Sequence, residues 1–306
     1  MKHHSLITAR MVPAVLLFLA ICMLPVITLA QSSVSYSPTL TKVFADKVLR
    51  VGVNPLFKPF SFEKDGKRVG VDIDIANLLA KKLGVTAKII VPKSFSDLIP
   101  MLQAGDIDII MAGMSITFAR AKVVDFSTPY FDTGLSILLN KAKSARLGIS
   151  GVLNYNALVR ELVRKKKMDQ LVIAVTKGKA PERIVPRFFP KATIKSYPSN
   201  EAAAMATLKG EADLMVHDEI FLKVWLKEHA KEAQFRLTVL DPPFKPDFYG
   251  MAIRKGNQDF LNMLGVFNLE LQANGYVAQY MGRYLPITSR VSTRSYNINE
   301  DYYGGD

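Results

Sequence analysis

Short apolar runs and amphipathic segments alternate along the early part of the chain. The run VLRVGV at 48–53 is typical of a buried strand, and Asn54 followed by Pro55 ends it. The segment VDIDIANLLAKKLG at 71–84 predicts a helix, because its apolar residues recur at helical spacing between acids in the first turn and lysines in the last. The next predicted elements are a strand at 86–91, a helix at 95–105 and a strand at 107–113. This order predicts a mostly parallel sheet with helices on both faces.

The same alternation begins again after Gly134. A Pro-rich segment at 241–250 interrupts it, and residues 287–306 form a polar tail that we expect to be poorly ordered. Further strands are predicted at 135–140, 171–175, 192–197, 212–218 and 251–254, and further helices at 155–167, 199–210 and 219–230, with a short helix after Pro181 and two helices that end near Leu285. The chain therefore has room for a second α/β unit.

A weak internal repeat relates the two halves. LIPMLQAGDIDIIMAG and AAAMATLKGEADLMVHD each contain a predicted helix, a glycine, acids and a buried strand. The repeat aligns Gly105 with Gly210, Asp108 with Asp213 and Gly113 with Asp218. It favours two α/β lobes, although glycine–acid turns also recur in unrelated α/β proteins. Because open α/β sheets bind ligands beyond the carboxyl ends of their strands, a cleft between such lobes would have Arg120 face Asp218.

Residues 1–30 have the features of a secretory signal peptide. A short positive stretch precedes an apolar run that closes on Thr28-Leu29-Ala30, a small-x-small cleavage pattern. Cleavage there would leave 31–45 as an N-terminal linker. Two alternatives stay open: the apolar run is long enough to be an uncleaved anchor, and Cys22 could carry a lipid, although the preceding Ile21 is large for a lipoprotein site.

Composition and charge exclude little by themselves. Cys22 is the only cysteine, so the mature chain is expected to have no disulfide and no thiolate chemistry. The net charge of +13 would suit nucleic acid or an anionic membrane, yet the basic residues are scattered and no nucleic-acid-binding motif accompanies them. The densest basic run, RELVRKKK at 160–167, is typical of a solvated helix face. We therefore expect no nucleic-acid partner.

Three segments resemble the family 3 extracellular solute-binding proteins, the periplasmic amino-acid receptors of ABC importers. They are LRVGVNPLFKPFSFEKDGKRVGVDIDIANLLAKKLG, FSDLIPMLQAGDIDIIMAGMSITFARAKVVDFSTPYFDTG and GEADLMVHDE. The resemblance implies an α/β, two-lobed periplasmic-binding-protein fold of type II, with extended hinge segments near 136–142 and 243–250. Its implied divisions are a first part of lobe 1 at 46–137, lobe 2 at 138–246 and a return segment of lobe 1 at 247–286.

The same resemblance implies how the α-carboxylate and α-ammonium of an amino acid would be held. Arg120, which follows Ser-Ile-Thr, matches the arginine that binds the carboxylate through both branches of its guanidinium, a geometry that lysine cannot reproduce. Ser115 stands where a hydroxyl or backbone N–H supports that carboxylate. The carbonyl of Gly113 and the carboxylate of Asp218 match groups that bind the ammonium. The alternative for Arg120 is a structural ion pair with Asp125 or an interaction with a helix end.

Aromatic and helix-start positions complete the implied ligand site. Phe57 and Phe95 stand where rings enclose the ligand side chain, with ordinary core packing as the alternative. The resemblance fails at Gly178-Lys179-Ala180, where amino-acid receptors usually carry serine or threonine that binds the α-carboxylate. Backbone N–H groups there could still bind an anion. Lys179 either faces solvent or turns inward, where it would favour an extra negative group on the ligand.

Two further positions refine the expected specificity. Asn54 stands where some receptors for basic amino acids carry an acid, which argues against lysine or arginine as ligand. Together with Lys179 it favours a polar or acidic amino acid. His217 is expected to point to the opposite side of its strand from Asp218 and to be structural.

The function implied by the resemblance is binding of a small solute, most simply an amino acid, in the periplasm. Hinge closure would bury the ligand, and the closed monomer would deliver it to an ABC transporter permease in the inner membrane. No cofactor, metal or catalytic residue is expected. The alternative is an enzyme similar to cyclohexadienyl or arogenate dehydratases on the same fold, for which Glu182 is the most convenient acid.

Overall fold

The computed structural model describes residues 35–285. The predicted signal peptide, Cys22 and the polar tail lie outside these residues. Within the segment expected to be a linker the chain is helical instead: α2, Pro38–Asp46, starts with a proline in its first turn and buries Leu40 and Val43. The spacing of these two side chains places them on one face of the helix, and that face joins the core.

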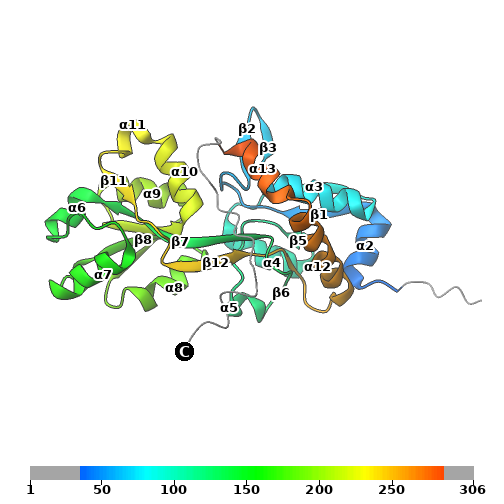
Figure 1. The fold of residues 1–306 in the computed structure, drawn as a ribbon. Coiled ribbons are helices and arrows are strands. Elements are labelled where there is room, and N and C mark those ends of the chain that lie inside the picture. Colours follow the sequence, from blue (N-terminus) through cyan, green and yellow to red (C-terminus); the bar gives the residue numbers. More distant parts are fainter. Residues whose placement is uncertain (1–34, 286–306) are drawn as a thin grey trace, which may run out of the picture. The chain divides into compact units, whose positions relative to one another are not determined.

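The first sheet is built mainly from the N-terminal half of the described chain (Figure 1). Four of its five strands run in one direction, and the fifth, contributed by the C-terminal part of the described chain, lies antiparallel to both of its neighbours. In spatial order the strands are β4 (Thr86–Ile90), β1 (Val48–Gly52), β5 (Ile109–Ile110), β13 (Ala252–Ile253) and β6 (Asp125–Phe126).

Helices cover both faces of this sheet. In β5 the neighbouring residues Ile109 and Ile110 belong to different core clusters, as strand alternation requires. Ile109 packs in the cluster that contains α2, α3, α12 and α13, and Ile110 packs with α4. These helices are α3 (Val71–Leu83), α4 (Leu98–Ala104), α12 (Gln258–Ala273) and α13 (Tyr276–Tyr284), with the short α5 (Phe118–Ala121) and the 3₁₀ turn η1 (Phe95–Asp97) at the sheet's edge.

The second sheet combines a parallel half with an antiparallel half. Its order is β11 (Leu237–Val239), β7 (Phe131–Asn140), β10 (Leu214–Asp218), β8 (Val172–Thr176) and β9 (Thr193–Tyr197). In β10, Leu214 and Val216 face the cluster of α7 and α8, while Met215 faces α9 and α10. The helices of this part are α6 (Lys141–Arg146), α7 (Tyr155–Arg164), α8 (Ala180–Phe188), α9 (Asn200–Lys209), α10 (Glu219–Glu228) and α11 (Ala230–Ala233), with the 3₁₀ turn η2 (Met168–Gln170).

Two paired strands run between the sheets (Figure 1). The first half of β7 pairs antiparallel with β12 (Lys245–Tyr249), from Phe131 opposite Tyr249 to Leu135 opposite Lys245. The second half of β7 then pairs with β10 and β11. β12 crosses between the sheets where the second hinge segment was expected. The first crossing is the first half of β7, and it begins a few residues before the hinge expected near 136–142.

The pattern of apolar residues missed the elements that are short or polar. These include the hairpin of β2 (Phe62–Lys64) and β3 (Lys67–Val69), and β12, which lies in the segment interpreted as a Pro-rich break. The α/β class with two sheets, each covered by helices, is confirmed.

Candidate functional site

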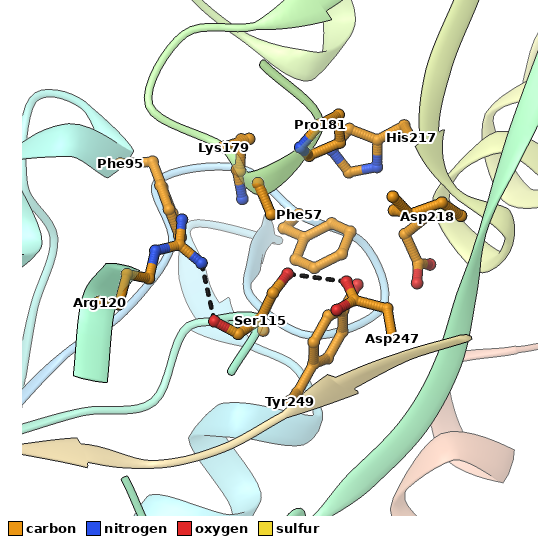
Figure 2. Close-up of a pocket in the computed structure, with 13 residues that line it drawn as sticks. Phe57, Phe95, Ser115, Arg120, Lys179, Pro181, His217, Asp218, Asp247 and Tyr249 are labelled. Atoms are coloured by element: carbon orange, nitrogen blue, oxygen red, sulfur yellow. Dashed lines mark hydrogen bonds between the residues drawn. The ribbon is translucent and has the colours of Figure 1, made fainter. Parts of the chain in front are cut away.

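A pocket lies beyond the carboxyl ends of strands from both sheets (Figure 2). β1 and β5 lead to it from the first sheet, and β8 and β10 lead to it from the second. The paired strands β7 and β12 form one side of it. The lining residues are Phe57, Phe95, Gly113, Ser115, Arg120, Leu135, Lys179, Ala180, Pro181, His217, Asp218, Asp247 and Tyr249.

All but one of the residues predicted to bind ligand line this pocket. The exception is Asn54, whose side chain is buried and hydrogen-bonded to nearby backbone groups. Its Nδ2 donates to the carbonyl of Ala112 at 3.3 Å, and its Oδ1 accepts the N–H of Leu56 at 3.3 Å. Asn54 therefore shapes the turn that follows β1 and does not face the pocket.

Arg120 contributes a buried cation whose direct partners are neutral. Its guanidinium donates from Nη1 to the carbonyl of Ser115 at 2.9 Å and from Nη2 to the carbonyl of Gly178 at 3.1 Å. Burial lowers the pKa of Arg120 to about 10, so it remains charged at neutral pH. Asp125, the alternative structural partner, instead accepts from Lys255 at 2.8 Å. The positive charge of Arg120 is thus held in place without a direct carboxylate partner in residues 35–285.

Asp218 provides a carboxylate at the end of β10. Its Oδ1 accepts the backbone N–H groups of Ile220 at 2.9 Å and Phe221 at 3.2 Å, which caps helix α10, and its Oδ2 accepts from the hydroxyl of Thr133. Burial raises the pKa of Asp218 to about 6, against the opposing effect of these hydrogen bonds. The side chain is therefore fixed by its own partners and still ionised at neutral pH.

A second carboxylate, Asp247, lies beside Asp218 in the pocket and was not predicted. The hydroxyl of Ser115 donates to Asp247 Oδ2 at 2.7 Å, so this contact joins the end of the first sheet to β12 (Figure 2). Burial raises the pKa of Asp247. Asp247 and Tyr249 are the buried side chains of β12, one face of the strand in alternation.

Lys179 turns inward, and its side chain has no hydrogen-bond partner in residues 35–285. The residue is 6% exposed, and its Nζ lies 3.6 Å from the ring centroid of Phe95 and 4.8 Å from that of Phe57. Burial lowers the pKa of Lys179 well below its usual range, and the nearby charge of Arg120 lowers it further. Of the two directions left open for Lys179, the structure has the inward one.

The two phenylalanines belong to the hydrophobic core and also border the pocket. Both line the pocket, and Phe57 lies so close to Gly113 that a Cβ added at this glycine would be 2.4 Å from Phe57 Cε1. Gly113 has a φ of +55°, which further favours glycine. The ring of Phe95 carries Lys179 near its face and has the guanidinium carbon of Arg120 5.4 Å from its centroid. Two cationic groups thus share one aromatic ring.

His217, which was expected to point to the opposite side of its strand from Asp218 and to be structural, also lines the pocket. Its ring lies 5.7 Å from that of Phe57 and 4.8 Å from that of Phe221, measured between centroids. Strand alternation does separate the two side chains, but β10 ends at the pocket, so residues from both of its faces border it. Burial lowers the pKa of His217 well below its usual range, and Lys179 lowers it further.

Five lining residues were missed by sequence reasoning: Leu135, Pro181, His217, Asp247 and Tyr249. A signal existed for two of them, because Asp247 and Tyr249 alternate in a segment that the resemblance already assigned to a hinge. Nothing in the local pattern distinguished Leu135 from the other apolar residues of β7.

A buried carboxyl lies beneath the pocket. Asp72, in the first turn of α3, accepts from the hydroxyl of Tyr130 at 2.7 Å, and the N–H of Gly113 donates to the same phenolic oxygen at 3.2 Å. Burial raises the pKa of Asp72 to about 7, partly opposed by the hydrogen bond from Tyr130. This network holds the backbone at Gly113, where the pocket begins.

Glu182, the acid considered for a dehydratase, is absent from the pocket lining. Its Oε2 accepts the N–H of Gly178 at 2.8 Å, and its Oε1 accepts from the hydroxyl of Ser196 at 2.6 Å. In residues 35–285 no cluster of three or more histidine, cysteine or acidic side chains is suited to a metal ion. Over the same residues no helix combines the length and apolar character needed to cross a bilayer.

Comparison with known proteins finds relatives that share this architecture. The L-arginine-binding protein of Pseudomonas aeruginosa is 28% identical over 246 residues, which cover 78% of this chain and 88% of that protein. A second relative is AncCDT-1, an ancestral amino acid-binding protein described as a precursor of cyclohexadienyl dehydratase. Its crystal structure matches with a TM-score of 0.67 and 30% sequence identity, and the match covers 82% of this chain and 100% of that one. A putative ABC transporter binding component from Wolinella succinogenes, complexed with lysine, is 30% identical with a TM-score of 0.67 and covers 79% of this chain and 97% of its own.

The family description agrees with these relatives. The family model for bacterial extracellular solute-binding proteins, family 3, matches residues 49–287, which include both sheets and every residue of the pocket. The two-lobed neighbours share the α/β architecture described above. The chain belongs to the bacterial extracellular solute-binding proteins, family 3.

Proposed function

We propose that the chain binds an amino acid in the pocket between its two sheets and delivers it to an ABC transporter permease. The observation that carries the proposal is the separation of charge across the pocket. The buried guanidinium of Arg120 lacks a direct carboxylate partner in residues 35–285, and the carboxylates of Asp218 and Asp247 lie opposite it (Figure 2). A zwitterion matches this arrangement, with its carboxylate on Arg120 and its ammonium on the acids.

Binding is proposed to proceed by closure about the β7–β12 pair. Arg120 already bonds to Ser115 on the side of the first sheet and to Gly178 on the side of the second. A ligand held by residues from both sides favours the closed arrangement, and it shifts the population by its extra affinity for that arrangement. Export through a cleaved N-terminal signal peptide would place this monomer in the periplasm, where the closed form meets the permease.

A thermal-shift screen of the purified mature protein against all amino acids tests the binding function. At least one amino acid should raise Tm, and its des-amino analogue and its amide should each raise it much less, because each lacks one of the two charges that the pocket recognises. Small-angle scattering should show compaction with the same ligand. If no amino acid stabilises the protein, or if stabilisation is equal for the des-amino analogue, the proposed function fails.

We further propose that the ligand is released unchanged. Glu182, the acid expected for a dehydratase, is engaged by Gly178 and Ser196 and serves the loop before α8. Since one structural relative is a precursor of cyclohexadienyl dehydratase, prephenate and arogenate are the substrates to test. Incubation with each should give no product, and turnover would replace the transport proposal by an enzymatic one.

A further inference from the structure

Two basic side chains of the pocket, Lys179 and His217, have no hydrogen-bond partner in residues 35–285, and the stronger base of the two is Lys179. The Nζ of Lys179 is buried without a hydrogen bond. By contrast, Arg120 donates to two carbonyls, Asp218 accepts two backbone N–H groups, and Asp247 accepts from a hydroxyl. A buried amine without an acceptor is costly, and burial disfavours its charged form; a ligand carboxylate that accepts from Nζ stabilises the ammonium of Lys179 and so gains affinity.

The backbone at the start of α8 offers little competition as an anion site. The N–H of Gly178 is used by Glu182, and Pro181 has no N–H to donate. Lys179 occupies the N-cap position of this helix, and its side chain makes no cap hydrogen bond. Ala180 is the remaining lining residue of this helix start with a backbone N–H, and the Lys179 side chain is the basic group that an anion there would meet.

The position of this ammonium also opposes a cationic ligand side chain. It lies against the rings of Phe95 and Phe57, and Arg120 adds a second cation near Phe95. Aromatic faces attract cations, but here the chain's own lysine already occupies them. A lysine or arginine ligand would bring a further basic group to the same rings and would need the same space.

We propose that Lys179 selects acidic amino acids, by binding the side-chain carboxylate of a ligand whose α-carboxylate is bound by Arg120. This rests on the proposed function and narrows its ligand class. It also separates this chain from two of its relatives, one of which is named for arginine and one of which was crystallised with lysine. The acids Asp218 and Asp247 remain for the ligand ammonium, so each charge of the ligand has a counterpart.

Calorimetry on the parent protein gives the first test. L-glutamate or L-aspartate should bind at least about tenfold more tightly than the matching amide, the effect of one hydrogen bond to a charged group, and L-arginine and L-lysine should bind more weakly still. If amino acids bind but glutamine, asparagine or a cationic amino acid binds as tightly as the acids, the Lys179 inference is overturned and the proposed function survives. If no amino acid binds, the proposed function fails and the inference fails with it.

The Lys179→Met variant gives the second test, because methionine keeps a long apolar side chain and removes the charge. In this variant the acid-to-amide affinity ratio should fall to within about threefold, mainly through weaker binding of the acid. Lys177→Met, at an exposed lysine two positions earlier, should keep the parent ratio. An unchanged ratio in Lys179→Met would mean that Lys179 only fills space. If that variant does not fold, Lys179→Gln takes its place, and the parent series already decides the preference.

Discussion

Removal of the Arg120 guanidinium should be the most damaging single change to ligand binding. The side chain is 7% exposed, so solvent screens its charge little. Leaving a ligand carboxylate in this pocket without its partner should cost about 2–5 kcal/mol, or roughly 30- to several-thousand-fold in affinity. Because of the burial we expect Arg120→Ala in the upper half of that range. Arg120→Lys keeps the charge but loses the planar pair of donors, so it should remain weaker than the parent by about tenfold or more.

The assay is calorimetric titration with the tightest amino acid from the thermal-shift screen. Lys122→Ala is the matched control, since Lys122 is an exposed cation that directly follows α5, the short helix that carries Arg120. The control should bind like the parent. Arg120→Ala should also scatter as a more open molecule without ligand, because the contacts to the carbonyls of Ser115 and Gly178 are lost. Binding by Arg120→Ala within about threefold of the parent would refute the assignment of this arginine to the ligand carboxylate.

Three further predictions concern pH and backbone geometry. Asp72 has its pKa raised to about 7, so between about pH 4 and pH 7 it binds a proton in the folded state that it lacks in the unfolded state. The free energy of unfolding should therefore fall as pH rises over this range, by at most about 4 kcal/mol. Urea unfolding of Asp72→Asn should show a weaker dependence of the unfolding free energy on pH. Asp218 loses its negative charge below about pH 6, so affinity for the amino acid should fall by up to about tenfold per pH unit there, and calorimetry on Asp218→Asn should show a flatter profile. Gly178→Ala should lower both Tm and affinity, because φ is +76° and the new Cβ would lie 3.0 Å from Ser96 Cβ; an unchanged Tm would show that the loop adapts without strain.

The fold could be predicted wherever burial repeats with a regular period. The strand at 48–53 and the helix at 71–84 fall within a residue of β1 and α3, because each buries one continuous apolar run or face. The strand expected at 107–113 is paired only over Ile109–Ile110, since the residues that follow leave the sheet to form the pocket. The largest error of the fold prediction was at 241–250, where the strand β12 was not predicted. Its prolines suppressed a strand prediction, yet β12 pairs with β7 along one edge and is bridged on its other edge only near Tyr249, to Ser115, so a proline is tolerated at Pro246.

The candidate site could be predicted where a motif fixes a residue and not where packing decides its direction. The repeat placed Asp218 at the end of its strand, and the Ser-Ile-Thr motif placed Arg120; both line the pocket. The inward turn of Lys179 could not be derived, because an N-cap residue before Pro181 can direct a long side chain to either side of the helix start. His217 was missed for a related reason. Alternation gives the face of a strand but not what covers that face, and at β10 the cover is Phe57 from the other half of the molecule.

The carbonyl contacts of Arg120 connect ligand binding to the arrangement of the two sheets. Ser115 belongs to the first-sheet side and Gly178 to the loop after β8, so a single guanidinium joins both sides before any ligand is considered. A ligand carboxylate competes with neutral carbonyl oxygens for this cation, and the charged acceptor forms the stronger hydrogen bonds. The exchange is therefore favourable without first breaking an ion pair. Had Asp125 neutralised Arg120, as the alternative interpretation required, the ligand would have had to displace a carboxylate of equal charge, and most of that gain would be lost.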